Sequence, residues 1–252
     1  MSAFIIVRTI YIVLILLLLA MDYFFVSIPF TYYLLPTAAF LVILFFGSAD
    51  IKLNFFIRSI NSFKTTEKTI ALTFDDGPSK HNTPPILDLL DKYGAKATFF
   101  CIGNKVEQNP EIAREIVKKG HLIGNHSYSH SNFFSLFGKK SIIREIRKTN
   151  QAITDATGEK CKIFRPPFGV TNPSIAKAIK QCGMKVLGWN IRSFDTTIKN
   201  PEKVAKRVLK KIKPGAILLL HDDRPDTAKT LEAILLYTKE HNYTCVFVPD
   251  LN

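Results

Sequence analysis

The residues whose types and spacing first suggest chemistry are the adjacent acids Asp75 and Asp76 and the pair His126 and His130. Two imidazoles and one carboxylate form a ligand set for a divalent metal that leaves coordination positions open for water and substrate. Because consecutive side chains point in different directions, only one of the two acids is expected to bind the metal. The other is free to act as a general base. This pattern indicates a metal-dependent hydrolase.

A third imidazole, His221, opens the sequence HDD. A protonated imidazole can act as the general acid toward a leaving amine. Each motif has an ordinary alternative: Asp-Asp-Gly-Pro also marks a simple turn, and a histidine at a strand end can be a core residue. The combination of these motifs, more than any one of them, favours a catalytic centre.

The elements that must position these residues are short apolar runs that alternate with helical patterns. Six helical patterns separate seven expected strands, namely TIALTF, KATFFCI, HLIG, KIF, KVLGW, AILLL and TCVFV. This alternation predicts a parallel sheet, either doubly wound or closed as a barrel. Both architectures place chemistry at the carboxyl ends of the strands. Polar clusters follow five of the runs, namely DDGP, NHSYSH, RPPFG, NIRSFD and HDD.

In their order, these motifs resemble those of the polysaccharide deacetylase family, also called the NodB-homology domain or carbohydrate esterase family four, over residues 65–250. The resemblance implies an α/β fold, an irregular (β/α)7-type barrel, here with an N-terminal transmembrane region. It implies zinc as the expected ion, with cobalt or nickel as alternatives. The implied roles are Asp75 as base, Asp76, His126 and His130 as metal ligands, Arg165 as the residue that steers the base, the Phe168 backbone N–H as an oxyanion donor, and His221 as general acid.

The fourth motif departs from the family pattern D-x-x-D-W, because this chain has Arg192-Ser193-Phe194-Asp195-Thr196. Asp195 matches the second acid, so the resemblance implies that it orients and charges His221. Arg192 and Thr196 do not match. The lost aromatic wall leaves the identity of the sugar open, whereas the core chemistry is unaffected.

The N-terminal part is predicted to be a membrane anchor at residues 1–48, with one or two transmembrane segments. Between Thr9 and Ala49 the only charged residue is Asp22, and the flanking apolar segments are long enough to cross a bilayer. A cleaved signal peptide is the alternative. Residues 49–67 are expected to be a juxtamembrane linker with an amphipathic piece on the bilayer surface. Residues 68–252 are then the catalytic domain.

The predicted function is removal of N-acetyl groups from an N-acetylglucosamine-containing polysaccharide, either peptidoglycan or a chitin-like polymer. The alternatives are a deacetylase or deformylase of a lipid-linked sugar and an inactive carbohydrate-binding relative. The expected partners are therefore an acetylated sugar polymer or lipid-linked sugar, and the membrane. The net charge of +13 comes without a nucleic-acid motif, so no nucleic-acid partner is expected. The four cysteines form no C-x-x-C pair and are expected to be buried free thiols.

The side of the membrane is the point at which two arguments conflict. Arg8 precedes the first apolar segment, and Lys52, Arg58 and Lys64 follow the second, so the positive-inside rule places both ends in the cytoplasm. Envelope polysaccharides lie outside the cell. On the ground of function we expect an extracytoplasmic catalytic domain.

Overall fold

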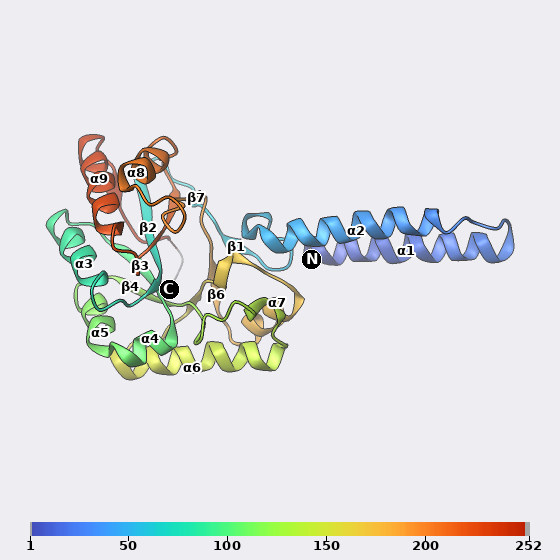
Figure 1. Cartoon of the computed structure of the whole chain (residues 1–252), viewed down its shortest axis with the longest axis horizontal. Helices are drawn as coiled ribbons and strands as arrows, with labels where there is room; N and C mark the ends of the chain where they lie inside the picture. Colours follow the sequence, from blue (N-terminus) through green and yellow to red (C-terminus); the bar gives the residue numbers. More distant parts are fainter. Residues whose placement is uncertain (1, 250–252) are drawn as a thin grey trace.

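The computed structural model describes residues 2–249, and it consists of an α/β domain from which a two-helix hairpin projects (Figure 1). The nine strands form one sheet in the order β1-β6-β5-β4-β3-β2-β8-β7, and β9 pairs with β2. All pairs of neighbouring strands are parallel. The strands are β1 (Ser59–Ile60), β2 (Thr69–Gly77), β3 (Ala97–Cys101), β4 (Leu122–Asn125), β5 (Ile163–Phe164), β6 (Lys185–Leu187), β7 (Ile191–Arg192), β8 (Ala216–His221) and β9 (Thr244–Cys245).

The seven expected strands are all present, and the predicted α/β fold of the irregular (β/α)7-barrel type is confirmed, with a parallel sheet that curls into a half-barrel. Two further strands, β1 and β7, have only two residues each. Each contains one apolar residue between polar neighbours, in RSIN and NIRS, so no apolar run marks it, and each forms by pairing with a distant segment. The six expected helices are also present, and one short helix, α4, was not expected.

The domain helices cover the outer face of the curled sheet (Figure 1). Local sequence explains several of their ends. Asn172 and Asn200 each stand directly before a proline at the first helical position. The side chain of each asparagine accepts a hydrogen bond from the backbone N–H three residues later. Gly158, with φ 79°, ends the longest of them. The helices are α3 (Thr83–Lys92), α4 (Gly103–Gln108), α5 (Pro110–Lys118), α6 (Lys139–Thr157), α7 (Pro173–Gln181), α8 (Pro201–Leu209) and α9 (Thr227–Glu240).

Strand β2 divides its side chains between two apolar clusters, as the alternation of a strand requires. Ile70, Leu72 and Phe74 belong to the cluster that includes the inner faces of α3 and α9. Ala71 belongs to a second cluster, which contains residues of β3, β5, β6 and β8. Asp75 has the same parity as Ala71 and therefore points to that side of the sheet.

The hairpin consists of α1 (Ala3–Phe24) and α2 (Thr31–Ala49), which are joined by residues 25–30. By length and composition, both helices could cross a membrane, and α1 has no buried residue. Tyr11 stacks on Phe40 with 4.3 Å between ring centroids and lies within hydrogen-bond distance of Thr37. Apolar side chains such as Leu16 remain more than half exposed along the hairpin. This large apolar surface is typical of a segment that meets lipid.

The segment after the hairpin, which we expected to be a juxtamembrane linker, packs against the domain in this structure. Ile51, Phe55 and Phe56 are buried, and β1 extends the sheet by pairing with β6. Ser62 then bridges to the start of β8. The stretch 49–67 thus completes one edge of the sheet, because its apolar residues find partners in the domain core.

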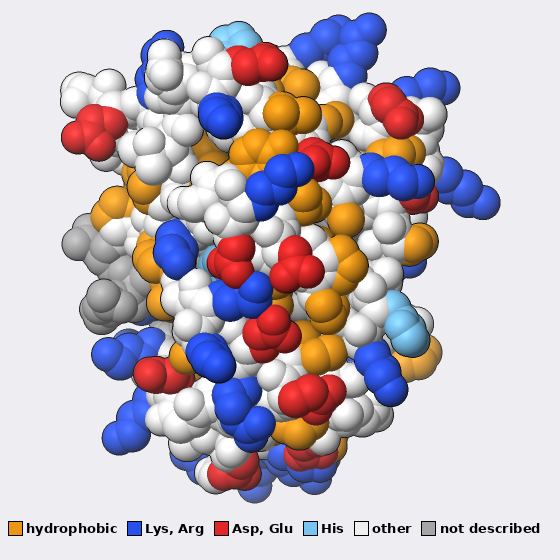
Figure 2. Space-filling model, turned by 90° about the vertical axis from the view of Figure 1, so that its left-hand side faces the viewer, with side chains coloured by type: hydrophobic (Ala, Val, Ile, Leu, Met, Phe, Trp, Pro, Cys, Tyr) orange, Lys and Arg blue, Asp and Glu red, His pale blue; other side chains and the backbone are white. Residues whose placement is uncertain are grey.

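Figure 2 shows the face opposite the hairpin, where basic and acidic side chains are intermixed.

The four cysteines are free, and two of them, Cys101 and Cys245, are buried. Burial raises the pKa of the Cys245 thiol to about 12, so this group is inert at neutral pH.

Candidate active site

Three side chains at the carboxyl ends of β2 and β4, the strands on either side of β3, form a candidate metal centre. Asp76 comes from the end of β2, His126 follows β4, and His130 lies in the loop beyond it. Their ligand atoms all lie within 4.8 Å of one another. Asp76 Oδ1 is 3.3 Å from His130 Nε2 and 3.5 Å from His126 Nε2. The structure therefore brings together the ligand set that the sequence predicts.

The backbone around these ligands is unusual. Asp76 has φ 73° and His130 has φ 47°, a region that costs a residue with a side chain of the order of 1–3 kcal/mol. The ladder between β2 and β3 shifts between Asp75 and Gly77, so the two consecutive carboxylates point in different directions. Lys105 Nζ donates to the Asp76 carbonyl oxygen at 2.6 Å and supports this turn. Sequence reasoning missed Lys105, because no motif precedes or surrounds it.

A cation would satisfy the electrostatics of this cluster. Asp76 Oδ1 is buried and, among the described residues, has no hydrogen-bond partner. Burial would raise the pKa of Asp76, but the facing imidazoles of His126 and His130 outweigh it and hold that pKa well below its usual range. Burial and the neighbouring His126 lower the pKa of His130 to about 4. A neutral imidazole and an ionised carboxylate are the forms that bind metals.

The backbone of Arg165 orients the imidazole of His126. Its Nδ1 lies 2.8 Å from the carbonyl oxygen of Arg165, which leaves Nε2 to face Asp76. Metal-binding histidines commonly donate their second ring nitrogen in this way, which determines the tautomer. Burial opposes protonation of His126, but the carboxylates of Asp75 and Asp76 outweigh it and raise its pKa. A bound cation would supply the positive charge that these carboxylates favour.

Asp75 is held by Arg165, whose side chain is fully buried. Arg165 Nη1 donates to Asp75 Oδ1 at 2.7 Å and to Thr73 Oγ1 at 2.9 Å. Its other nitrogens donate to the carbonyl oxygens of Leu187 and Gly188, and the guanidinium lies 4.1 Å from the Phe100 ring centroid. One Asp75 oxygen is therefore anchored. The other, Oδ2, lies 3.7 Å from His126 Nε2 and faces the cluster.

His221 reaches the same site from β8, because the register of β2 and β8 pairs it with Asp75. Its Nδ1 lies 2.8 Å from Asp195 Oδ1, and its backbone N–H donates to Asp195 Oδ2 at 2.8 Å. Ser193 Oγ also donates to Asp195. Burial opposes protonation of His221, but the bond to Asp195 and its charge outweigh it and raise the pKa of His221. The imidazolium form is thus favoured, as a general acid requires.

The RPPFG turn places Phe168 beside the cluster. Its ring centroid is 4.8 Å from that of His130, and its side chain is 48% exposed. Phe168 has φ 61°, and within the described part of the chain its N–H has no acceptor. A side chain at Gly169 would place its Cβ 2.5 Å from Trp189. The turn thus leaves one backbone donor available at the site, and Trp189 is a supporting residue that we did not anticipate.

The altered fourth motif contains an aromatic ring in a different position. Arg192 and Arg207 lie over the ring of Phe194, at 5.0 and 4.4 Å from its centroid. Phe194 has φ 64°, and the next residue is Asp195. Asp195 of this motif therefore contacts His221, while the guanidinium groups of Arg192 and Arg207 cover the ring of Phe194.

Asp222 is a further residue that sequence reasoning left without a role. It is buried, accepts from Thr83 Oγ1 at 2.6 Å, and donates through its backbone N–H to the Asp75 carbonyl oxygen. Burial raises the pKa of Asp222 to about 7. A Cβ at Gly77 would lie 2.1 Å from its Oδ2, so this contact explains the glycine after the two acids.

Comparison with known proteins agrees with the site. The model of the family described as "Polysaccharide deacetylase" matches residues 63–187. The chain is similar to peptidoglycan-N-acetylglucosamine deacetylase PgdA of Listeria monocytogenes, with 37% identity over 186 residues and 74% of this chain. It spans only 39% of that relative's length. A peptidoglycan-N-acetylglucosamine deacetylase of Bacillus cereus is 37% identical over 190 residues, which cover 73% of this chain and 88% of the relative.

Solved structures show the same relationship. Peptidoglycan deacetylase PdaC from Bacillus subtilis aligns with a TM-score of 0.70 and 32% identity, covering 75% of this chain and 92% of that chain. A CE4 family pseudoenzyme from Bacillus anthracis aligns with a TM-score of 0.69 and 31% identity, covering 75% of this chain and 66% of the other. With the fold, the motifs and these relatives in agreement, the chain belongs to the polysaccharide deacetylase family.

Proposed function

We propose that this protein is a metal-dependent hydrolase that removes N-acetyl groups from an N-acetylglucosamine-containing polysaccharide of the cell envelope. The observation that carries this proposal is the convergence of a three-ligand cluster, an anchored carboxylate and a charged histidine at one end of the sheet. Relatives named for action on peptidoglycan support the choice of substrate.

Asp76, His126 and His130 would hold the ion, and zinc suits a site of two imidazoles and one carboxylate. When bound, the ion supplies Lewis acidity toward the acetyl carbonyl and the attacking water. The orphaned Oδ1 of Asp76 fits this role, because a buried carboxylate oxygen otherwise needs a partner. Cobalt and nickel accept the same donor atoms.

The protein's own groups would then move the protons. Asp75, anchored through Oδ1 by Arg165, takes a proton from the attacking water with its free Oδ2. The N–H of Phe168 donates to the developing oxyanion. His221, held charged by Asp195, donates a proton to the departing sugar nitrogen. Acetate and a free amine are the products.

Acetate release is the direct test. We expect the zinc-loaded protein to release acetate from N-acetyl chito-oligomers or from isolated peptidoglycan. Zinc binding with no turnover on any N-acetylated sugar would instead make the protein an inactive carbohydrate-binding relative. The similarity to a CE4 family pseudoenzyme makes this measurement necessary. Acetate or formate release only from a lipid-linked sugar would point to the alternative substrate.

We expect Asp195→Asn to narrow the pH–activity profile from the alkaline side. Asp195 raises the pKa of His221, so the protonated acid persists to higher pH in the parent protein. Removing the carboxylate lowers that pKa, and the alkaline limb should move down by about one to two pH units. The profile of kcat/KM on a chito-oligomer measures this shift, and the acid limb serves as the internal control. A profile that superimposes on the parent's would rule out this role for Asp195.

We further propose that residues 1–48 anchor the protein in a membrane and that residues 68–252 form an extracytoplasmic catalytic domain. The two long apolar helices support the anchor, and the peptidoglycan-directed relatives support the outer side. The basic residues beside the hairpin favour the inner side. Protease added to intact cells should digest the domain. Full protection would show that the domain lies on the cytoplasmic side.

A further inference from the structure

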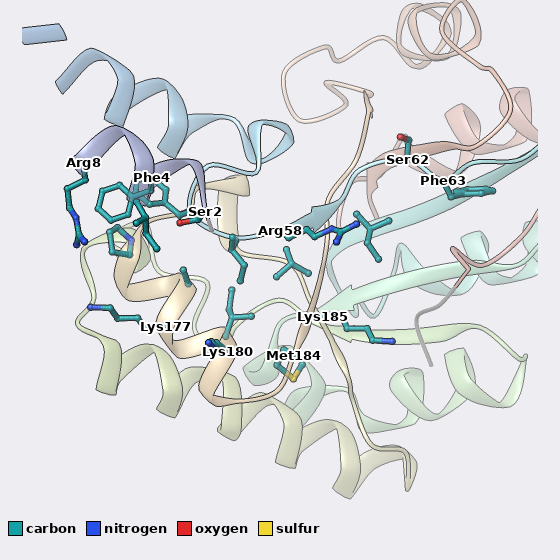
Figure 3. Close-up of a pocket in the computed structure, with 18 of the residues that line it drawn as sticks. Ser2, Phe4, Arg8, Arg58, Ser62, Phe63, Lys177, Lys180, Met184 and Lys185 are labelled. Atoms are coloured by element: carbon teal, nitrogen blue, oxygen red, sulfur yellow. The ribbon is translucent and has the colours of Figure 1, made fainter. Parts of the chain in front are cut away.

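A large pocket lies where the hairpin meets the domain, away from the catalytic cluster (Figure 3). Its volume is about 1260 Å³, and it is lined by the first turns of α1, the segment around β1, helix α7 and the start of β6. None of the catalytic or metal-binding candidates lines it. The proposed reaction therefore gives this pocket no role.

Among the residues that the structure describes, all the charged side chains that line the pocket are basic. Arg8, Arg58, Lys177 and Lys180 belong to its wall, together with Lys64 and Lys185. No aspartate or glutamate is among the described residues that line the pocket. Within residues 2–249, no carboxylate lies at ion-pair distance from the side chains of Arg8, Arg58, Lys177 and Lys180. Figure 3 shows Arg8 and Lys177 toward one end of the pocket and Arg58 and Lys185 toward the other. On the face shown in Figure 2, by contrast, basic and acidic side chains are intermixed.

Apart from Ser2 and Ser62, the remaining lining is apolar, with Phe4 and Ile5 from α1 and Phe56, Ile57 and Met184 from the domain. A site that combines several cations with an apolar wall suits a ligand with an anionic head and a hydrocarbon part. A soluble polyanion would leave the apolar wall without a partner. An anionic phospholipid of a membrane surface combines an anionic head and a hydrocarbon part in one molecule.

The position of the pocket also favours a lipid. Helix α1 begins at the domain and runs outward along the hairpin, so Phe4 and Arg8 lie at its domain end. If the hairpin crosses a bilayer, this end lies at the level of the headgroups, and the exposed apolar side chains of α1 continue from the pocket into the acyl region.

We propose that this pocket binds the headgroup of an anionic phospholipid from the leaflet that faces the domain. The phosphate lies at the end of the pocket that Arg8, Lys177 and Lys180 line, and the glycerol and upper acyl chains lie against Phe4 and Ile5. A bound lipid seats the domain on the membrane in one orientation. This inference rests on the proposed membrane anchor and is independent of the proposed reaction.

The test uses the full chain in nanodiscs of phosphatidylcholine with a minor fraction of phosphatidylglycerol. After transfer to detergent, native mass spectrometry counts the phosphatidylglycerol molecules that stay bound. We expect the parent protein to retain at least one, and Lys177→Gln/Lys180→Gln to retain it at least about tenfold more weakly, given the attraction of each basic residue to anionic lipid. The matched control is Lys203→Gln/Lys206→Gln, which removes two exposed lysines of the same spacing from α8.

The outcomes separate the possibilities. Loss of retention in the α7 variant alone, with parent-like retention in the α8 variant, supports the pocket. Equal loss in both variants would show attraction by net charge and would overturn the proposal, as would displacement of the lipid by millimolar inorganic phosphate. A photoreactive phosphatidylglycerol should label the peptide that contains residues 173–181, and labelling only elsewhere also overturns it. Both variants should deacetylate a soluble chito-oligomer like the parent, so failure of the lipid site is distinguishable from failure of the proposed reaction.

Discussion

Asp75→Asn is expected to abolish most of the deacetylase activity while zinc binding persists. The asparagine can still accept the hydrogen bond from Arg165, but it cannot take a proton from water. Loss of a general base costs about 10²- to 10⁴-fold in rate. Asp75 Oδ2 faces His126 without being part of the three-ligand cluster, so the metal site should survive. Acetate release from a chito-oligomer and zinc content per protein measure the two effects.

Stability has to be measured on the same variant. Arg165 is fully buried, and removing the charge of its partner can destabilise the fold by about 3–5 kcal/mol. A thermal unfolding curve shows whether the lost activity comes from chemistry or from unfolding. Asp155→Asn, at an exposed position on α6, is the matched control and should behave like the parent. If folded, zinc-loaded Asp75→Asn keeps activity within about tenfold of the parent, the assignment of the base is wrong.

Asp76→Ala is expected to give the complementary result, in which zinc is lost together with activity. Removing the carboxylate leaves only His126 and His130 as ligands of the described cluster. Loss of a residue that merely supports a ligand costs about 10- to 100-fold in metal affinity, so loss of the ligand itself should cost at least about 100-fold. Zinc affinity by competition with a chelator and acetate release at limiting zinc test this directly.

The two neighbouring variants serve as controls for each other. The parent protein should lose activity when a chelator removes its metal and regain it when zinc is added back. Asp76→Ala should recover activity only at high zinc, whereas Asp75→Asn should not recover at any concentration. An exchange of these two phenotypes would show that Asp75 is the ligand and Asp76 the base.

Much of the fold was predictable, because its main signals are local. The apolar runs that became β2 and β8 are long enough to be recognised as buried strands, and the asparagine–proline starts of α7 and α8 are encoded in adjacent residues. The rule that parallel sheets carry their chemistry at the carboxyl ends of strands then placed the five polar clusters at one end of the sheet. The eight candidate residues lie there, as that argument requires.

The segment 49–67 shows where local signals were insufficient. Its charges and its position after the hairpin suggested a linker on the bilayer, and its short strand has only two residues. Whether Ile51 and Phe56 meet lipid or a protein core depends on what distant chain segments offer them. In the folded protein β6 and the start of β8 supply those partners.

The sequence by itself determined the alternation of the seven expected strands with six helices, the donor types of the metal cluster and the presence of a separate base and acid. Only the tertiary structure decided how these groups are held. Arg165 reaches Asp75 across 90 positions in the chain, His221 faces Asp75 through the register of two strands, and Lys105 supports the turn at Asp76. Contacts of this kind depend on distances of a few ångströms between segments that are remote in the chain, and no local pattern specifies them.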